Sequence, residues 1–593
     1  MKGAEKKCRK LRTGKVPYSP KVAMIGSEIR YWEAILDRIL KKPTNARTLK
    51  RLKKKAGVTT TTSHLTIEQV KDLSWDARKR YREAKTNAPT HRRSHLESLP
   101  PKQRNHYLRV EEQRRQGTIA RSITGKLKGA GVSMVTTQNP DGQMTHHTTK
   151  RAVENAIIDA NKFKYSQSTE TPPMQPYFVA EFGHTGNTPA AEAVLNGTYT
   201  PPDDCDPVLR DFLIHCKRPP GIPTDTCPRN ITTTEHRSGW KRAREHTQAG
   251  RSGITFAMFK ANALDPDLAA VDASFRNIGY ASGFAFDRWK TGINCMLLKK
   301  TNNYLVNKLR TILLLEADSG MNYKKLCRDV MWFAELAGAI PPELGGGRRK
   351  HRPIEQVLCS VLLNDLLRQK RKAAAITSSD FKECFDRIVH AIAFICLRRL
   401  GMPGAPIQSM IDAIQAMTHF IRTAFGDSSA NYSADPLLAP YMGLLQGNAA
   451  AMAGCTAFVS VIVEMMKSAG FGLEMWNALA YEAIKLVCLN FVDDTQLFHG
   501  GPTNYTSGAD VVAQMQPMLN YWEAALRATG GALAHDKSYW SLINFKWEGG
   551  KWRCCALSDT PGDLTLPCGP DRVPTPIPRL EVTEARELLG AMI

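Results

Sequence analysis

The chain has 593 residues, of which 42% are hydrophobic and 8% aromatic, so it can build more than one core and is not a wholly disordered protein. Its 81 Lys and Arg outnumber 56 Asp and Glu, and the net charge of +25 favours a polyanionic partner, either nucleic acid or an anionic membrane. Residues 1–130 hold 34 basic and 11 acidic residues, whereas residues 131–593 are almost neutral, so the charge belongs to the front of the chain.

The sequence predicts neither a secretory signal nor a membrane-spanning helix. Its basic first twelve residues are not followed by an apolar segment. The uncharged stretch 436–463 contains several prolines and glycines, which is typical of a buried loop and helix rather than of a bilayer span. The 14 cysteines lack the paired spacing of structural zinc sites. We therefore expect reduced thiols in an intracellular protein, nuclear or cytoplasmic.

The first 130 residues are predicted to form a mainly helical basic region. Apolar residues recur at helical spacing over 29–40, and residues 74–85 and 105–128 also read as helices. We interpret region 1–130 as a nucleic-acid-binding arm, and the alternative for such a charge run is a solvated helix face. The densest basic run in this region comprises Lys50, Arg51, Lys53, Lys54 and Lys55.

The middle of the chain gives weaker patterns. A helix is predicted over 148–163. Residues 172–248 are rich in Pro, Gly, Thr and Asp, so we expect 131–250 to be a loop-rich connector of unknown role. From residue 253 onward the apolar periodicity returns and continues nearly to the end.

Three later stretches carry groups that suit metal chemistry. In 374–387 an apolar, β-branched run leads into Asp380. In 442–466 a turn with Gln446-Gly447 opens a long helix of small residues. In 484–498 two strand-like runs flank Asp493-Asp494, as in a β-hairpin with the acids at its turn.

An acid pair between two apolar runs is costly, because the carboxylates repel each other and partial burial raises their pKa values. A bound divalent cation removes the repulsion, and oxygen ligands favour Mg²⁺ or Mn²⁺. Asp380 can supply a further ligand from a neighbouring strand. Two such ions can activate an attacking 3′ hydroxyl and stabilise a leaving pyrophosphate. The alternative is a surface turn and an unrelated aspartate, which fits poorly when all three stretches occur in order.

In this order the stretches resemble motifs A, B and C of reverse transcriptases, most closely those of eukaryotic, non-LTR-like retrotransposons. Residues 299–312 resemble the segment that holds the incoming triphosphate, and 530–538 resemble motif D. Residues 587–593 resemble the strand that begins the primer grip. The resemblance covers about 250–593.

The resemblance implies an α+β fold: a right-hand polymerase with fingers, palm and an incomplete thumb, preceded by the mainly helical basic region. It places a fingers-like region at 251–372 and a palm with motifs A–D at 373–545. Residues 546–593 would form the start of the primer grip and thumb, so we expect the thumb to be truncated.

The resemblance also assigns roles to residues. Asp380, Asp493 and Asp494 would be the catalytic carboxylates that bind two Mg²⁺ ions, with Mn²⁺ as the alternative metal, and Lys537 is a candidate general acid. Phe385 would block a ribose 2′ hydroxyl, although a core phenylalanine is the alternative interpretation. The expected nucleotide-binding residues are Arg310, Lys300, Phe385, Gln446 and Gly447.

The implied function is that of a retrotransposon RNA-directed DNA polymerase, a nucleotidyltransferase. It would add dNTPs to the 3′ hydroxyl of a DNA or RNA primer on an RNA template. Two alternatives stay open: a catalytically impaired or domesticated RNA-binding protein, and an RNA-dependent RNA polymerase. No membrane partner is expected, and the sequence leaves the oligomeric state unknown.

Overall fold

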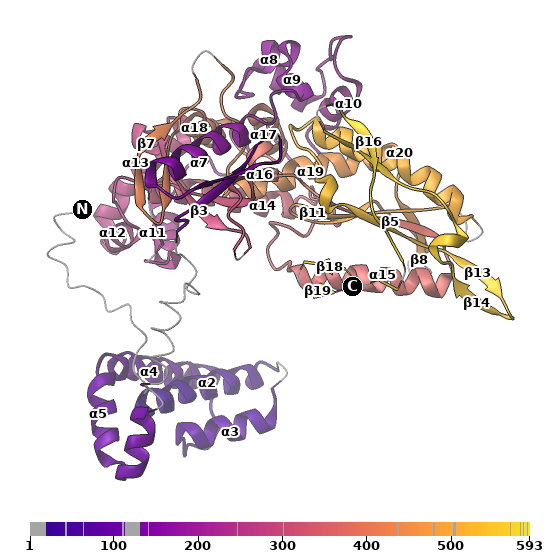
Figure 1. The fold of residues 1–593 in the computed structure, drawn as a ribbon. Coiled ribbons are helices and arrows are strands. Elements are labelled where there is room, and N and C mark those ends of the chain that lie inside the picture. Colours follow the sequence, from indigo (N-terminus) through magenta and orange to yellow (C-terminus); the bar gives the residue numbers. More distant parts are fainter. Residues whose placement is uncertain are drawn as a thin grey trace. The chain divides into compact units, whose positions relative to one another are not determined.

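The chain folds into two compact units, one of Lys6–Ala130 and one made chiefly of Gly131–Ile593 (Figure 1). Both helices and strands build the larger unit, so the fold is mixed α and β. The computed structural model describes residues 19–592 except for a set of short gaps at 42–43, 63, 110–111, 113–130, 140, 246, 249, 301, 436–437, 478–480, 502–505, 570, 582, 585 and 590.

The described part of the smaller unit is a bundle of helices. Side chains from three of them, among them Trp32, Leu49 and Val70, form its core. Arg80 donates two hydrogen bonds to the Glu28 carboxylate, at 2.7 and 3.1 Å, and so ties the helix at 67–86 to the helix at 20–39. The helices are α2 (Pro20–Ile39), α3 (Ala46–Ala56), α4 (Ile67–Thr86) and α5 (Ala88–Ser98).

Two of the three helices predicted in this region are confirmed, since 29–40 falls largely in α2 and 74–85 falls in α4. Of the third, predicted over 105–128, residues 105–109 and 112 are helical, and most of the rest lies outside the described residues.

The segment expected to be a loop-rich connector contains several helices between its loops. The helix predicted over 148–163 is confirmed as α7. Further short helices follow it, and their side chains Phe178, Leu209 and Phe212 are buried in the main core. The elements are β1 (Val135–Gln138), β2 (Met144–His147), α7 (Lys150–Tyr165), α8 (Pro176–Phe182), α9 (Pro189–Asn196), α10 (Pro207–His215) and α11 (Thr233–Arg242).

The composition misled the prediction because these helices are short and begin with residues that also mark loops. Helices α8, α9 and α10 each begin with a proline, which is tolerated at the first helical position. The side chains of Thr188, Asp206 and Thr232 accept backbone hydrogen bonds at the helix starts. Proline, threonine and aspartate therefore act here as helix-start residues.

A four-stranded sheet with the order β4-β3-β6-β7 follows in the chain. Strands β3 and β6 are parallel, and the other neighbours are antiparallel. Its strands are β3 (Thr291–Leu298), β4 (Leu309–Leu314), β6 (Thr418–Thr423) and β7 (Gly426–Tyr432). The helices near it in the chain are α12 (Phe256–Asn262), α13 (Pro266–Ser282), α14 (Ala317–Leu336), α17 (His390–Arg399) and α18 (Gly404–Gln415).

A five-stranded sheet with the order β10-β11-β5-β12-β17 carries the acidic motifs. Alternate side chains of β5 point to opposite faces, so Ala375 joins the main core while Ile376 joins a smaller core with Leu367. Helices α15 and α20 thus lie on opposite sides of this sheet (Figure 1). The elements are β5 (Ala374–Asp380), β10 (Cys488–Phe491), β11 (Asp494–Gly500), β12 (Tyr539–Ile543), β17 (Arg579–Leu580), α15 (Pro353–Lys370), α16 (Cys384–Arg387) and α20 (Gly508–Arg527).

The uncharged stretch 436–463 enters a core helix, as the sequence predicts. Helix α19 (Ala451–Ser468) is long and apolar enough to cross a membrane by length and composition alone, but 78% of it is buried inside the protein. Four two-stranded hairpins complete the described fold: β8 (Leu473–Asn477) with β9 (Glu482–Leu486), β13 (Phe545–Glu548) with β14 (Lys551–Cys554), β15 (Thr565–Cys568) with β16 (Val573–Pro576), and β18 (Glu587–Leu588) with β19 (Ala591–Met592).

Candidate active site

The three predicted catalytic carboxylates come together at one end of the five-stranded sheet. Asp380 ends β5 and is the direct cross-strand partner of Asp494, which begins β11. Asp493 lies in the two-residue turn between β10 and β11, and its carbonyl accepts a 3.1 Å hydrogen bond from the Phe381 backbone N–H. The predicted hairpin with acids at its turn is therefore confirmed.

Specific contacts hold this turn in place. Val492 adopts a positive φ of 66°, which is unfavourable for a β-branched residue. The Asn490 side chain donates to the Val492 carbonyl and to Thr495 Oγ1, at 3.1 and 2.8 Å. A Cβ at Gly346 would lie 2.6 Å from the Val492 backbone nitrogen, so the glycine allows the preceding loop to pack against the turn. The turn is thus fixed on both sides.

Asp380 is held through its backbone as well. Its carbonyl accepts a 2.8 Å hydrogen bond from the Ala534 N–H, and Lys382 donates a bond of the same length to Ala532. The segment that resembles motif D therefore runs alongside the end of β5, and it brings Lys537 to the carboxylates.

The carboxylates carry more negative charge than their surroundings neutralise. Burial and the charge of Asp380 raise the pKa of Asp493. Burial together with the charges of Asp493 and Asp380 raises the pKa of Asp494 to about 6. The cost that the sequence predicts for an acid pair is therefore present in the folded protein.

Lys537 partly offsets this charge, because its ammonium group donates to the Asp380 carboxylate. Partial burial works against the charged amine, but the hydrogen bond to Asp380 and the charges of Asp380, Asp536 and Asp493 raise the pKa of Lys537. An amine held in this way is a poor proton donor, so the expected general-acid role requires that Lys537 leave Asp380.

A pocket of about 340 Å³ opens beside the carboxylates. Ser378 and Ser379 contribute to its lining from neighbouring positions of β5, and the buried hydroxyl of each finds no hydrogen-bond partner within the described part of the chain. Unpaired buried hydroxyls are costly, so this pocket is suited to polar groups or water. Its lining residues are Ser378, Ser379, Asp380, Asp494, Thr495, Lys537 and Tyr539.

Further cationic side chains lie close to the carboxylates. Arg310, exposed on β4, lies near enough to Asp493 to lower the pKa of that carboxyl group. Partial burial and the neighbouring charges of Lys164, Lys537 and Arg310 lower the pKa of Lys299. These cations are well placed for an anionic ligand such as a triphosphate.

Lys299 and Lys164 were not among the predicted site residues. The sequence analysis named Lys300, and it assigned no chemistry to the segment that holds Lys164. Lys299 and Lys300 both lie just beyond β3 and both are exposed, so the Lys-Lys pair alone does not show which of them lies near Arg310.

Asp386, in the predicted motif A, forms an ion pair with Lys164 of α7. The Lys164 ammonium lies 2.8 Å from the Asp386 carboxylate, which is buried. A Cβ at Gly443 would lie 2.5 Å from the Asp386 backbone, so the motif B loop packs directly on it. Asp386 therefore connects α7, α16 and the motif B loop, and it holds the local backbone in place.

Gln446 and Gly447 lie against β4. The Leu313 N–H donates a 2.7 Å hydrogen bond to the Gln446 carbonyl. Gly447 has a φ of 117°, and a Cβ there would lie 2.3 Å from the Leu313 carbonyl oxygen. Gly447 thus allows a close approach between two backbones. The backbone that approaches it is β4 of this chain, whereas the sequence analysis expected a bound nucleotide there. Phe385 is half-buried and packs on the main core, so it keeps one exposed side.

The donor set fits a hard divalent cation, since it consists of carboxylates whose mutual repulsion such an ion would relieve. Within the residues that the structure describes, no group of three or more His, Cys, Asp or Glu side chains is already arranged to hold a metal ion. In the conformation observed, the Lys537 ammonium occupies the side of Asp380 where a cation would act.

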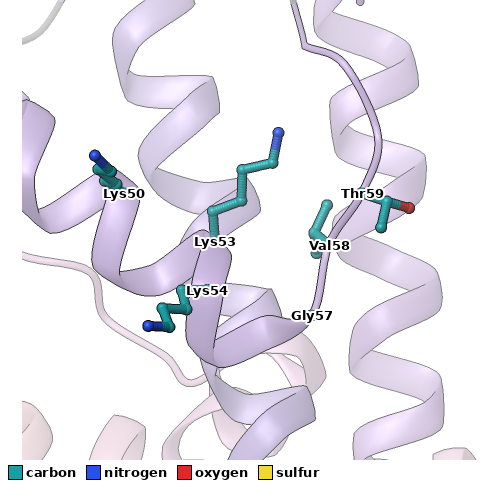
Figure 2. A pocket seen from close by; sticks show the side chains of 6 residues that line it. All are labelled: Lys50, Lys53, Lys54, Gly57, Val58 and Thr59. Carbon is teal, nitrogen blue, oxygen red and sulfur yellow. The ribbon is translucent and has the colours of Figure 1, made fainter.

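A second pocket, of about 360 Å³, lies on the helical unit at the end of α3. Figure 2 shows the side chains of Lys50, Lys53 and Lys54 on the helix and Val58 and Thr59 in the segment that follows it. Lys50, Arg51, Lys54 and Lys55 are exposed, and Lys53 is half-buried. No ion pair to an acidic residue is found for these five cations within the described ranges.

Comparison with known proteins agrees with the geometry of the larger unit. Residues 287–560 match the family described as "Reverse transcriptase (RNA-dependent DNA polymerase)". The match runs from just before β3 to just beyond β14, so it includes Asp380, Asp493 and Asp494. No protein in a search of curated sequences matched the chain. The match supports a reverse transcriptase, and with it RNA-dependent DNA polymerase activity in general.

Proposed function

We propose that this protein is the RNA-directed DNA polymerase of a retroelement, of the eukaryotic non-LTR-like type, acting in the nucleus or the cytoplasm. The observation that carries the proposal is the meeting of Asp380, Asp493 and Asp494 at one sheet end, inside the segment that matches the reverse transcriptase family. The five-stranded sheet would then be the palm, and the four-stranded sheet would be part of the fingers.

In this proposal Asp380 and Asp493 are the principal metal ligands and Asp494 is the third carboxylate. Two Mg²⁺ ions, or Mn²⁺ in their place, would supply the Lewis-acid chemistry that activates a primer 3′ hydroxyl and stabilises pyrophosphate. Lys537 would leave Asp380 when the cation binds and become free to donate to the pyrophosphate. Support for this exchange comes from the ion pair that Lys537 makes with Asp380.

Arg310 and Lys299 would hold the triphosphate of the incoming dNTP. Arg310 acts on the Asp493 carboxylate, and Lys299 lies near enough to Arg310 for the two charges to interact. The Arg310 guanidinium can make forked, charge-assisted bonds to phosphate oxygens, which a single ammonium group cannot. Gln446 is half-buried beside β4 and would border the same nucleotide.

The half-exposed Phe385 would exclude ribonucleotides by colliding with the ribose 2′ hydroxyl. We expect Phe385→Ala to raise the incorporation of UTP relative to dTTP by at least about tenfold. Steady-state incorporation of each nucleotide on one RNA template measures the ratio. Phe425→Ala, at an exposed phenylalanine between β6 and β7, is the matched control. An unchanged ratio would contradict the sugar-selection role.

The helical unit would bind the RNA template through five cations of α3, the exposed Lys50, Arg51, Lys54 and Lys55 and the half-buried Lys53. The support is that these side chains stand on a folded helix without acidic partners in the described residues. Such cations bind phosphates mainly by charge, so they would give affinity rather than sequence preference.

Primer extension on poly(rA)/oligo(dT) with dTTP and Mg²⁺ tests the proposal. We expect extended DNA product. Folded protein that binds RNA but extends no primer would instead favour the impaired or domesticated RNA-binding protein. A preference for UTP over dTTP would favour the RNA-dependent RNA polymerase.

A further inference from the structure

Helix α7 ends against the turn that contains Phe385, although α7 lies outside residues 287–560. Lys164, in the last turn of α7, extends its ammonium group toward two carboxylates of motif A. The ammonium nitrogen lies 2.8 Å from the carboxylate of Asp386 and 3.8 Å from that of Glu383. One of these acids precedes Phe385 and the other follows it, so Lys164 bridges the turn that carries the phenylalanine ring.

This bridge is shielded from water. The side chains of Asp386, Lys164 and Glu383 are 6%, 12% and 22% exposed. Burial raises the pKa of Asp386, and the charge of Lys164 opposes that rise by favouring the ionised carboxylate. Surface ion pairs contribute little, whereas removal of one partner from a buried pair leaves a charge without compensation. The bridge can therefore fix the conformation of the turn.

The turn needs support because part of its backbone is strained. Glu383 has a φ of 50° and a ψ of 46°, in the left-handed region that residues other than glycine seldom adopt. Gln167, just past α7, donates a hydrogen bond to the second oxygen of the Glu383 carboxylate. The buried Arg387 donates two bonds to Gln167, at 2.8 and 3.1 Å. The end of α7 and the residues after it thus hold the turn on both sides of Phe385.

The same end of α7 also holds the motif B loop. The Tyr165 carbonyl accepts a 3.0 Å hydrogen bond from the Met442 N–H, and the Tyr165 side chain is buried. Further along the loop, the Leu445 N–H donates a 2.9 Å hydrogen bond to the Phe385 carbonyl. Helix α7 therefore fixes Phe385 relative to the loop in which Gln446 would border the nucleotide.

Lys164 is not free to bind a triphosphate itself. Its ammonium group is paired with Asp386 and Glu383 and is largely shielded from water. Arg310 and Lys299, by contrast, are exposed. Lys164 therefore acts on motif A rather than on the nucleotide.

We propose that Lys164 is a positioning residue that maintains sugar selection by Phe385. The inference rests on the proposed function, and it adds a helix outside the family match to the polymerase site. A steric wall rejects a ribose 2′ hydroxyl only while the wall stays in place, because a ring that can move aside removes the collision. By fixing the residues before and after Phe385, Lys164 keeps the turn that carries the ring from shifting.

Steady-state incorporation of dTTP and UTP by the full chain on poly(rA)/oligo(dT) tests the proposal. We expect Lys164→Met to raise the incorporation of UTP relative to dTTP by at least about threefold. Lys164→Arg should restore the parent ratio, since a guanidinium can bond both carboxylates. A general loss of structure, or of a phosphate contact, would slow both nucleotides alike and leave the ratio unchanged.

Lys162→Met is the matched control, because Lys162 is exposed on the same helix and carries the same charge. It should keep the parent ratio. A ratio that Lys162→Met raises as much as Lys164→Met does would overturn the proposal, since loss of charge on α7 would then be sufficient.

A double-variant cycle shows whether Lys164 acts through Phe385. Lys164→Met should raise the ratio in the parent chain but should raise it no further in Phe385→Ala, where no ring is left to hold. An equal rise in both backgrounds overturns the proposal, because Lys164 would then act independently of Phe385.

Lys164→Met leaves the buried Asp386 carboxylate without its partner, so a second variant guards against loss of folding. Lys164→Met combined with Asp386→Asn removes both charges, and it should show the same rise in the ratio. Far-UV circular dichroism checks that each variant is folded. The parent ratio in either folded variant overturns the proposal.

The same measurements separate this inference from the proposed function. A parent chain that incorporates neither nucleotide overturns both. A ratio that rises in Phe385→Ala but not in folded Lys164→Met contradicts the role of Lys164 and leaves the polymerase function intact.

Discussion

At the scale of single residues, unbalanced negative charge distinguishes the candidate active site. Asp380, Asp493 and Asp494 repel one another, and Lys537 offsets only part of that repulsion. The sequence predicted the acids because an adjacent pair between two apolar runs is rare without a metal. It did not predict the pairing of Lys537 with Asp380, since a residue 157 positions away meets Asp380 only in the folded chain.

Asp494 should make the metal-free protein less stable as the pH rises. Its pKa is about 6 in the folded protein and near 3.8 when unfolded, so the native state binds more protons between these values. Stability therefore falls as the pH rises through this window, and the loss is complete above about 6. In metal-free buffer, the free energy of unfolding of Asp494→Asn should increase relative to that of the parent chain by on the order of 1 kcal/mol between pH 4.5 and pH 7.5. This value allows for the partial exposure of Asp494.

Urea unfolding of both proteins at each pH, with a metal chelator present, measures this gain. Asp287→Asn, at a highly exposed side chain, reports the general effect of removing one negative charge. A stability difference between Asp494→Asn and the parent that does not change with pH contradicts the proposed charge repulsion.

Lys537→Met should increase the stabilisation that Mg²⁺ gives. Without the Lys537 ammonium, the carboxylates keep more unpaired charge in the metal-free protein, so a cation relieves more repulsion. We expect a larger rise in Tm on adding Mg²⁺ than in the parent chain. Lys308→Met is the control, since Lys308 lies 3.9 Å from Asp536 and not on Asp380. An equal rise in Tm on adding Mg²⁺ to the parent chain and to Lys537→Met would contradict this explanation.

At the scale of elements, the helices and strands with a regular residue pattern along their whole length were predicted well. The strand at 374–380 and the helix at 451–468 appear where the apolar and small-residue patterns place them. The helices α8 to α11 were missed, because each is seven to ten residues long and begins in loop-like composition. Residues that start short helices also start turns, and only tertiary packing decides between the two.

Gly447 should be among the most sensitive positions in the motif B loop. Gly447→Ala puts a Cβ 2.3 Å from the Leu313 carbonyl oxygen and a side chain at a φ of 117°. We expect a loss of about 3 kcal/mol in the free energy of unfolding. Gly426→Ala is the matched control, because its φ is 88° but the space around it is open. It should cost about 1 kcal/mol. Equal losses in urea unfolding would show that contact with β4 does not matter.

Helix α3 should contribute a salt-dependent part of RNA affinity. Replacing Lys50, Arg51 and Lys54 with Gln should weaken binding to single-stranded RNA and flatten the plot of log affinity against log salt by about 2. Fluorescence anisotropy at several salt concentrations measures the slope. Gln at Lys71, Lys79 and Lys85, exposed on α4, is the control of equal charge. If both triple variants change the slope equally, overall charge is responsible and α3 is not a binding surface.

At the scale of the whole molecule, the charge is divided between two units with different chemistry. The basic unit is helical where it is described, and the nearly neutral unit holds the carboxylates and the cations close to them. Sequence composition predicted this division of charge.

The central claim is that Asp380 and Asp493 catalyse RNA-templated DNA synthesis, and single-turnover incorporation of dTTP on poly(rA)/oligo(dT) tests it most directly. The account predicts that Asp380→Asn and Asp493→Asn each lower the incorporation rate by at least about a thousandfold, with the RNA-primer complex still formed. Asp287→Asn should match the parent chain. Incorporation at the parent rate by folded Asp380→Asn or Asp493→Asn protein would contradict the account.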